Sequence, residues 1–595
     1  MAVPPARTVG RDSTMNNVRL LVRVGCVVVL LGLCGVAGAS ATKRPDSGAR
    51  VAYTSFELVL EHGHVRPAPL GEPVAARRAR TASAATPTPA TPSDPATPPA
   101  GAPARRGLTF PQAISELAAR QEITAATASA DRWQWTAARE ADRKLSGARR
   151  ADLGEVLGTL QAIARSGALT PARLPALALT LAANRRWWTS GPLIAADQRV
   201  GFPASHLVWE FYPGQGLEIQ WLGTFGAADG FIDAHDSTDL ASLIDQALSL
   251  AVPRGGGIAW EYDFSFDGGS PPWVSAITDG TAVEALTGAA TLLHNGAYLT
   301  DAHNALGIFE VPPPVGVAST ASAGAWFLIY SFAPHEYVIN AFIQSLVGLF
   351  DLAEQGDTLA RTLFERGNAE ARIALPDYNT GYWSMYDQYT ESTLSYHELL
   401  TGFLANLCTD TKKTSPAALW VLGASSTVPS GGSTGASGST TTGGGTPAGG
   451  ATGSSGPTGA TGSSGATGSS GATGSTGPTS PANPNAIYCT TAAAFQADLK
   501  QPPVIKLAPI SNAAAHSVTK VAFTLSKIST VTFAVRDTGK TLSLSTQLLG
   551  HGTHSLSWRP PSAGRWTIEV TAVDLAGNRT AQALPVSVGA AKSAR

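Results

Sequence analysis

Tyrosines crowd one short stretch of the sequence, beside acidic residues and a histidine. Residues 375–407 read LPDYNTGYWSMYDQYTESTLSYHELLTGFLANL and contain Tyr378, Tyr382, Tyr386, Tyr389, Tyr396, Asp377, Asp387, Glu391 and His397. A tyrosine phenol can act as a general acid, or as a base where a cation or hydrogen bonds favour the phenolate. Tyrosines also pack against helices with their hydroxyls in water. Composition alone leaves both interpretations open.

The order of residues in this stretch predicts a polar loop that leads into a helix. Asn379-Thr380-Gly381 is typical of a turn. From Tyr396 onward the apolar residues follow helical spacing, at Leu399, Leu400, Phe403, Leu404 and Leu407. Loops carry functional residues more often than the elements they join, so the candidate site is expected where this loop meets the helix.

Several short motifs in this region resemble those of the glucuronyl C5-epimerase family. The family's Y-D-T-G turn, Tyr-Asp pair and Tyr-His pair are matched by Tyr378–Gly381, Tyr386-Asp387 and Tyr396-His397. Upstream, similar segments are Trp273–Leu286 (WVSAITDGTAVEAL), Tyr337–Leu352 and Leu363–Gly367 (LFERG). The resemblance extends from Trp260 to Leu407, and Glu210–Phe225 is similar to the family's F-Y-P-I-Q segment. Several motifs in the same order and spacing are more specific than any one of them.

The resemblance implies roles for individual residues. It implies acid–base catalysis by Tyr330, Tyr386 and Tyr396, which match tyrosines implicated in the family. It implies a substrate-binding set made of Tyr212, Gln220, Trp260, Asp279, Asn340, Tyr378, Tyr389 and His397. Epimerisation of a uronic acid at C5 removes a proton from one face of the sugar and delivers one to the other. The reaction needs an acid and a base, so no cofactor and no metal are expected.

Three single residues depart from the family pattern. Tyr389 stands where the family has an arginine, which removes a clamp for the substrate carboxylate. Leu400 replaces the second histidine of Tyr-His-x-x-His, and Asp279 replaces a glutamine. Arg372, or the pair Arg185-Arg186, could supply a replacement cation. The departures leave the charge of the substrate and the position of reaction open.

Three functions are consistent with these residues. The first is an enzyme similar to C5-epimerases that converts D-glucuronate to L-iduronate-type residues, or a related uronate, in a polysaccharide. The second is a polysaccharide lyase, which shares the abstraction of the C5 proton and then eliminates. The third is a non-catalytic glycan-binding protein of the cell envelope. All three predict a polysaccharide partner.

The elements around these residues divide the chain into five parts. Residues 1–41 are expected to form a signal peptide or N-terminal membrane anchor, because Arg19 and Arg23 precede VGCVVVLLGLCGVAGA and Ala39-Ser40-Ala41 resembles a cleavage site. The protein is therefore expected to be exported to the envelope or the exterior. Residues 42–106 are a predicted Pro/Ala/Thr-rich linker and residues 423–484 a Gly/Ser/Thr-rich linker, both disordered.

The two remaining parts are expected to be folded. Residues 107–422 are predicted to be mainly α, with helices over 282–293, 337–355, 358–375 and 396–407, and the resemblance implies an α/α toroid. Residues 485–595 are predicted to form an all-β, immunoglobulin-like sandwich, because apolar residues alternate at Val531, Phe533 and Val535 and again after Trp566. Every matched motif lies before residue 423, so the helical part is expected to work without the sandwich.

The net charge and the positions of the cysteines give further expectations about partners, metal sites and disulfides. The formal net charge is −1, which gives no electrostatic reason for a nucleic-acid partner. The absence of C-x-x-C spacing makes a structural zinc site unexpected. Cys408 and Cys489 lie beyond the predicted signal, and export favours a disulfide between them. Two free thiols are the alternative.

Overall fold

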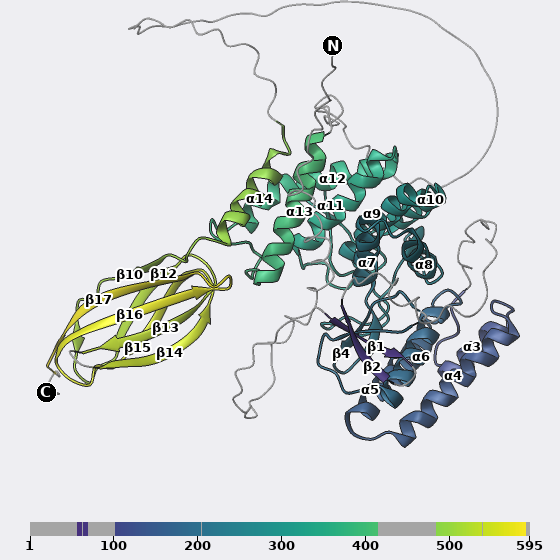
Figure 1. Cartoon of the computed structure of the whole chain (residues 1–595), viewed down its shortest axis with the longest axis horizontal. Helices are drawn as coiled ribbons and strands as arrows, with labels where there is room; N and C mark the ends of the chain where they lie inside the picture. Colours follow the sequence, from purple (N-terminus) through teal and green to yellow (C-terminus); the bar gives the residue numbers. More distant parts are fainter. Residues whose placement is uncertain are drawn as a thin grey trace, which may run out of the picture. The chain divides into compact units, whose positions relative to one another are not determined.

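The computed structural model describes residues 102–203, 205–413, 483–537 and 540–590, together with the strands at 56–61 and 64–69 (Figure 1). The predicted signal or anchor at 1–41 and the predicted linker at 423–484 lie outside these described residues. None of the helices in the described residues is long and apolar enough to cross a membrane.

Four helices form the N-terminal part of the region 107–422, which was predicted to be mainly α. They are α3 (Phe110–Ala119), α4 (Ala125–Lys144), α5 (Gly147–Ser166) and α6 (Leu174–Ser190). Thr109 and Gln112 form a capping box that starts α3. Gly167 ends α5 with φ +76°, a left-handed conformation that glycine adopts at low cost. The buried stripe of α5 packs these helices together, and Leu153, Val156, Leu157 and Leu160 carry it.

A five-stranded sheet follows in the order β2-β1-β3-β4-β5. Its strands are β1 (Phe56–Glu61), β2 (His64–Pro69), β3 (Arg199–Gly201), β4 (Trp209–Tyr212) and β5 (Gly216–Ile219). Strands β1 and β2 fall inside the region 42–106 that we expected to be a linker, so the structure differs there. The segment FELVLE supplies the β-forming residues. Strand β1 pairs in parallel with β3, which extends the sheet that carries Tyr212.

The central helices and short hairpins follow β5. They are α7 (Trp221–Asp233), α8 (Ser237–Leu248), β6 (Val252–Arg254), β7 (Gly257–Ala259), α9 (Ala276–Leu292), α10 (Ala297–Asn304), the 3₁₀ helix η1 (Ala305–Phe309), β8 (Ala318–Thr320), β9 (Ala325–Phe327), α11 (Ile339–Glu354), α12 (Thr358–Ala374), the 3₁₀ helix η2 (Leu375–Tyr378) and α13 (Leu394–Lys413). Helices α9, α11, α12 and α13 correspond to the four predicted from spacing. The toroidal arrangement stays a prediction.

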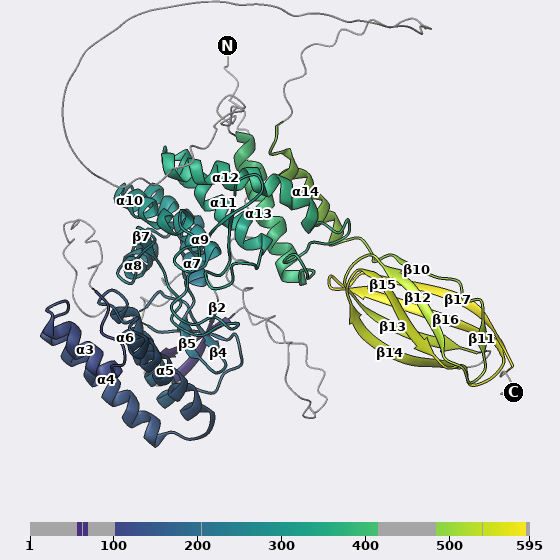
Figure 2. The same ribbon diagram turned by 180° about the vertical axis from the view of Figure 1, so that it is seen from behind.

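Helices α9 and α11 pack against each other at very short range (Figure 2). A Cβ atom on Gly348 would lie 2.0 Å from the carbonyl oxygen of Gly280, so only glycine fits there. This close approach fixes α11 against α9. The N-terminal end of α11 carries Ile339 and Asn340, which contact the tyrosine-rich loop described below.

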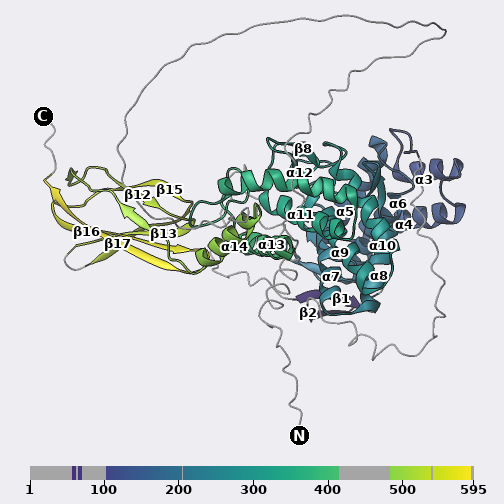
Figure 3. The same cartoon turned by 90° about the horizontal axis from the view of Figure 1, so that it is seen from above.

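Helix α14 (Ala486–Asp498) begins the segment that we assigned to the C-terminal sandwich. It lies beside α13 (Figure 3). Cys408 of α13 and Cys489 of α14 form a disulfide, which confirms the predicted pairing. The chain therefore returns to the helical region before it enters the strands.

The remaining strands form the C-terminal β region, defined here as residues 505–589. They are β10 (Ile505–Leu507), β11 (Ala513–Ala514), β12 (Thr519–Leu525), β13 (Ser529–Arg536), β14 (Thr541–Leu549), β15 (Gly552–Trp558), β16 (Gly564–Asp574) and β17 (Arg579–Gly589). They make a sheet β10-β12-β15 and a sheet β11-β17-β16-β13-β14. Phe523 of one sheet and Phe533 and Ile568 of the other share one core. A β-rich C-terminal region is thus present, while its immunoglobulin-like character stays a prediction.

Candidate active site

A small cavity lies where strands β4 and β5 meet the segment 262–278 and Tyr330. Its lining residues are Tyr212, Gln220, Tyr262, Phe264, Phe266, Trp273, Ser275, Ile277, Thr278 and Tyr330. Its volume is about 20 Å³, enough for one water molecule. Tyr330, Tyr212 and Gln220, which the resemblance had assigned to a site, are brought together here.

Aromatic side chains hold Tyr330 in this cavity. Its ring stacks on Phe332 at 5.0 Å and meets Trp273 edge-on at 5.5 Å between centroids. The next residue, Ser331, donates its backbone N–H to the carbonyl of Val274 at 3.0 Å. Both the ring and the backbone of this segment are therefore fixed, as a site requires of its side chains.

Tyr212 presents a buried phenol in the same cavity. Its ring packs on Phe264 at 4.6 Å, and its buried hydroxyl lies near the side chains of Glu210 and Gln220 but makes no well-formed hydrogen bond with the described residues. Burial raises the pKa of Tyr212 well above its usual range, so the phenol is a proton donor at neutral pH. An unsatisfied buried hydroxyl costs about 1–3 kcal/mol, which an oxygen atom of a ligand would offset.

Tyr262 differs from Tyr212 because its hydroxyl is fully engaged. It hydrogen-bonds the Oγ1 of Thr278 at 2.9 Å and accepts the backbone N–H of Leu222 at 3.2 Å. Burial raises its pKa, so this phenol is protonated too. Gln220 also has a structural partner, since its Oε1 accepts the N–H of Gly223 at 2.8 Å and caps α7. Among these groups the hydroxyl of Tyr212 makes the weakest hydrogen bonds, so it is the group that a ligand can engage most easily.

Glu210 interacts with Tyr212 from the same face of β4, and it was not among the site residues predicted from the sequence. The alternation in Trp209–Tyr212 places residues 210 and 212 on one face of the strand, a signal that the sequence contains. Glu210 pairs with Arg199 at 3.3 Å and lies opposite Glu218 in the sheet. Burial nevertheless raises the pKa of Glu210 to about 7, because desolvation outweighs the attraction of Arg199. The carboxyl can therefore exchange a proton near neutral pH.

Tyr386 and Tyr396 form a second group of phenols. Their ring centroids lie 4.6 Å apart. The carbonyl of Tyr386 accepts the N–H of Ile339 at 3.1 Å, and the side-chain amide of Asn340 donates to the carbonyl of Tyr396 at 3.2 Å. The first turn of α11 therefore holds the backbone at both tyrosines. Asn340 is buried in this bond, and its predicted contact with substrate stays a prediction.

Glu336 interacts with one acidic residue next to each of the two groups. It lies in the segment between Tyr330 and α11. Burial, followed by the negative charges of Asp267 and Asp387, raises its pKa to about 7. Asp267 follows a residue that packs on Tyr330, and Asp387 follows Tyr386. The carboxyl that is poised near neutral pH thus lies near one sequence neighbour of each tyrosine group. Nothing in its position in the sequence distinguished it beforehand.

The remaining predicted site residues Trp260, Asp279, His397 and Tyr389 line neither pocket. Trp260 donates its backbone N–H to Asp279 at 3.3 Å, and both are buried outside the lining of the cavity. Burial raises the pKa of Asp279 well above its usual range. His397 stacks on Trp383 at 3.8 Å, and burial lowers its pKa to about 4, so its ring is neutral. Tyr389 is 81% exposed. Their substrate-binding roles stay predictions.

A second, larger pocket adjoins the Tyr386 loop. Its volume is about 370 Å³, and it is lined by Thr320, Ala321, Ser322, Trp326, Tyr337, Glu370, Ala374, Asp377, Tyr378 and Gln388. Tyr378, a predicted substrate-binding residue, donates its hydroxyl to the carbonyl of Tyr337 at 2.7 Å. The lining contains aromatic rings and two carboxylates but no lysine or arginine. Such a pocket is suited to a sugar without negative charge.

The arginines considered as replacement cations lie elsewhere. Arg185 stacks over Trp133 at 5.5 Å and Arg186 over Phe202 at 5.5 Å. The Nε of Arg372 donates to the carbonyl of Asn368 at 3.3 Å. None of them lines either cavity. Within the described residues, no group of three or more His, Cys, Asp or Glu could hold a metal ion.

Comparisons with known proteins agree with the resemblance. Residues 255–416 match the family model of the D-glucuronyl C5-epimerase C-terminus, which confirms the predicted family for this part of the chain. A D-glucuronyl C5-epimerase of Caenorhabditis elegans is 30% identical over 131 residues, which cover 20% of this chain and 21% of that protein. An uncharacterized protein of Methanocaldococcus jannaschii is 28% identical over 138 residues, which cover 22% of this chain and 45% of that protein. The chain thus spans less than half the length of either relative.

Proposed function

We propose that this protein is a carbohydrate C5-epimerase that inverts a uronate residue within a polysaccharide. One observation carries the proposal. Tyr330, Tyr386 and Tyr396 all lie inside the segment that matches the family, and each has a backbone or ring position fixed by its neighbours. Glu336, with its pKa raised to about 7, interacts with Asp267 and Asp387, which are sequence neighbours of the two groups.

The proposed chemistry is a proton exchange without net oxidation. The C5–H bond breaks as a base takes the proton, and the electron pair delocalises into the adjacent carboxylate. A donor on the opposite face then delivers a proton to C5. Tyr330 faces one side of the sugar, and Tyr386 with Tyr396 faces the other. Glu336 passes protons between the phenols and solvent, for which a pKa near the working pH is best suited.

The substrate carboxylate needs neutralisation, because its charge grows as the proton leaves. The cavity offers phenols in place of the family arginine, whose position Tyr389 occupies. The Tyr212 hydroxyl, which is protonated and makes no well-formed hydrogen bond with the described residues, is the donor that we assign to a carboxylate oxygen. The small volume of the cavity in the free protein requires side chains to move apart when the sugar binds.

The second pocket indicates which kind of sugar is next to the uronate in the proposed substrate. Glu370 and Asp377 disfavour an acidic sugar there, whereas the rings of Trp326, Tyr337 and Tyr378 can pack on a pyranose. We assign to this pocket the sugar next to the uronate, and we propose that this sugar has no negative charge. The apolar run near the N-terminus supports export, so the proposed substrate is an envelope or extracellular polymer.

Incubation of uronate polymers with the protein in D₂O tests the proposal. The expected result is deuterium at C5 together with inverted residues, both detected by NMR. An unsaturated product with ultraviolet absorbance, in place of inverted residues, would establish the lyase alternative.

A non-catalytic glycan-binding protein is the other candidate. The small cavity and the loss of the family arginine to Tyr389 favour it. Binding of a uronate polymer with no deuterium at C5 would support this candidate and reject the epimerase.

A further inference from the structure

The loop that carries Tyr386 has contacts with the C-terminal β region at both of its ends. We call residues 382–391 the tyrosine loop. Near its start lies Trp383, and at its end lies Glu391. Within the loop, Met385 and Glu391 form an isolated β-bridge, and the N–H of Tyr386 donates to the carbonyl of Thr390 at 2.8 Å. Whatever fixes the ends of this loop therefore fixes Tyr386.

Glu391 joins the end of the loop to two turns of the β region. Its carboxylate accepts the backbone N–H of Ile528 at 2.9 Å, between β12 and β13, and that of His551 at 2.6 Å, between β14 and β15. The ring of His551 lies 3.1 Å from the same carboxylate, whose side chain is 5% exposed. A buried carboxylate is stable only where such donors replace water, and here the β region supplies them.

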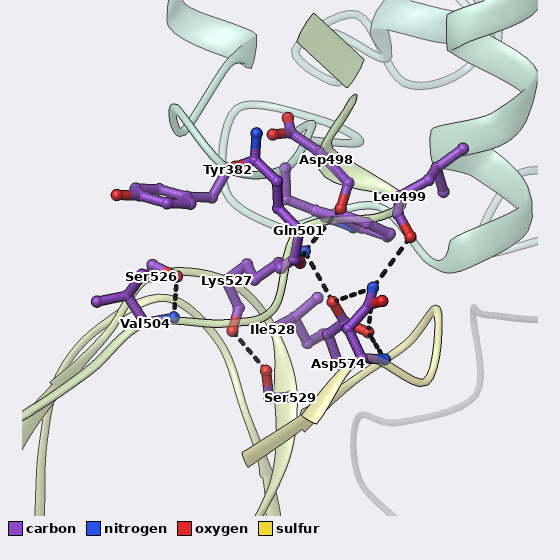
Figure 4. A network of polar contacts seen from close by, with 12 residues as sticks. Tyr382, Asp498, Leu499, Gln501, Val504, Ser526, Lys527, Ile528, Ser529 and Asp574 are labelled. Atoms are coloured by element: carbon purple, nitrogen blue, oxygen red, sulfur yellow. Dashed lines mark hydrogen bonds and ion pairs between the residues drawn. The ribbon is translucent and has the colours of Figure 1, made fainter. Parts of the chain in front are cut away.

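Lys527 contacts the start of the tyrosine loop. Its ammonium group is 5.3 Å from the centre of the Trp383 ring, a cation–π distance. It pairs with Asp574 at 2.7 Å, and both side chains are fully buried. It also donates to the carbonyls of Asp498 and Gln501, at the end of α14. Figure 4 shows the Lys527 side chain directed toward Asp574 and the carbonyls of residues 498 and 501.

The residue after Tyr396 is held from the same side. The Nε2 of His397 lies 3.0 Å from the carbonyl of Phe495 in α14, and its ring packs on Phe495 at 5.1 Å. The disulfide between Cys408 and Cys489 fixes α14 on α13. Sequence beyond residue 484 therefore contacts the neighbours of both Tyr386 and Tyr396.

We propose that the C-terminal β region and α14 position the tyrosine loop, with Glu391 and Lys527 as the positioning residues. The inference rests on the proposed function for its catalytic consequence, but the positioning itself does not depend on it. It differs from our expectation that residues 107–422 would work without the C-terminal part. Loss of that part would leave the buried Glu391 carboxylate without its donors and Trp383 without its cation.

Hydrogen–deuterium exchange in the full-length protein tests the positioning directly. Replacement Glu391→Ala removes the acceptor, and we expect amides of residues 382–393 and those of Ile528 and His551 to exchange about tenfold faster or more. The matched control is Glu569→Ala, which removes an ion pair with Arg536 on the β region, away from the loop. The control should leave the exchange of the loop unchanged.

A second, milder variant keeps the experiment decisive if Glu391→Ala does not fold. Glu391→Gln keeps the shape and one acceptor oxygen, so we expect exchange in the loop to rise to a level between that of the native protein and Glu391→Ala. If Glu391→Ala folds and its loop amides exchange at the native rate, the proposal is overturned. If Glu391→Ala does not fold, a native rate of loop exchange in folded Glu391→Gln overturns it.

Activity separates this proposal from the proposed function. If the native protein exchanges deuterium at C5 of a uronate polymer, Glu391→Ala should lower kcat by about tenfold or more with a smaller change in KM, because binding groups outside the loop remain. An unchanged kcat with a mobile loop would overturn the catalytic consequence. If the native protein exchanges nothing, the proposed function fails, while amide exchange still decides whether the loop is positioned.

Discussion

The rings of Tyr386 and Tyr396 lie 4.6 Å apart, although ten residues separate them in the sequence. The first turn of α11 produces this proximity, because Ile339 donates to the backbone of one tyrosine and Asn340 to that of the other. The pair is thus a property of the tertiary structure and is anchored on a helix that packs tightly against α9.

Tyr212→Phe should reduce activity without loss of stability. The hydroxyl that it removes is buried and makes no well-formed hydrogen bond with the described residues, so the free energy of unfolding should stay the same or rise by up to about 1 kcal/mol. We expect kcat/KM on a uronate polymer to fall about tenfold, as for loss of one hydrogen bond to a charged group.

The control for this variant is Tyr262→Phe, which lines the same cavity. Its hydroxyl bonds Thr278 and Leu222, so its removal should destabilise the fold by about 1 kcal/mol or more. Denaturant unfolding and steady-state kinetics on both variants give the comparison. Equal destabilisation of both variants would show that the Tyr212 hydroxyl has a partner in solution.

Glu210 should make stability depend on pH in a defined direction. Its pKa is about 7 in the folded protein and near 4.5 when unfolded, so the folded state binds the proton more tightly. Its stabilising contribution is complete below the unfolded pKa and is lost as the pH rises through the folded pKa. The native protein should lose roughly 2–3 kcal/mol more than Glu210→Gln between about pH 5 and about pH 8. Denaturant unfolding at the two pH values measures this difference, and parallel curves would contradict it.

Asp377→Lys should change the preference for the sugar beside the uronate. Asp377 and Glu370 make the second pocket acidic, so the native protein should favour polymers in which that sugar is uncharged over sulfated ones. A lysine should reduce the ratio of the two kcat/KM values by about tenfold. Glu155→Lys on α5, which makes the same charge change on an exposed surface, should leave the ratio as it is. An unchanged ratio in Asp377→Lys would place that sugar elsewhere.

Tyr389→Arg restores the arginine of the family at an exposed position. Because Tyr389 is 81% exposed, the free energy of unfolding should change by no more than about 0.5 kcal/mol. A guanidinium pairs with a carboxylate more strongly than a phenol does, so the preference among uronate polymers should shift toward the more acidic ones. Tyr389→Gln, which adds no charge, is the control. Identical preferences in all three proteins would exclude this position from substrate contact.

The sequence predicted the helices of the matched segment well because their apolar spacing is strong, as in α11 with Ile339, Phe342, Ile343, Leu346 and Val347. It also predicted the disulfide, because the expected export and the positions of the four cysteines left one natural pair. The hairpin at residues 56–69 was missed because its pairing with β3 spans more than 130 residues of sequence, and local composition does not reveal such a partner.

The candidate site was predicted only in part, and for a physical reason. Motif positions indicated Tyr330, Tyr386 and Tyr396, but burial decides which groups are poised for proton transfer. Glu210 and Glu336 acquire pKa values of about 7 through desolvation by distant segments. Conversely, His397 is conspicuous in the sequence, yet its ring is neutral and engaged by Ser384 and Phe495.

The most direct test of the account is deuterium exchange at C5 in three single variants, Tyr330→Phe, Tyr386→Phe and Tyr396→Phe. Each change removes one hydroxyl and keeps the ring packing. We expect exchange to fall by about 10²–10⁴-fold for groups that act as acid or base, with unfolding free energies within about 1 kcal/mol of the native value. NMR of a uronate polymer in D₂O measures the exchange. Exchange at the native rate in all three variants would contradict catalysis by these tyrosines.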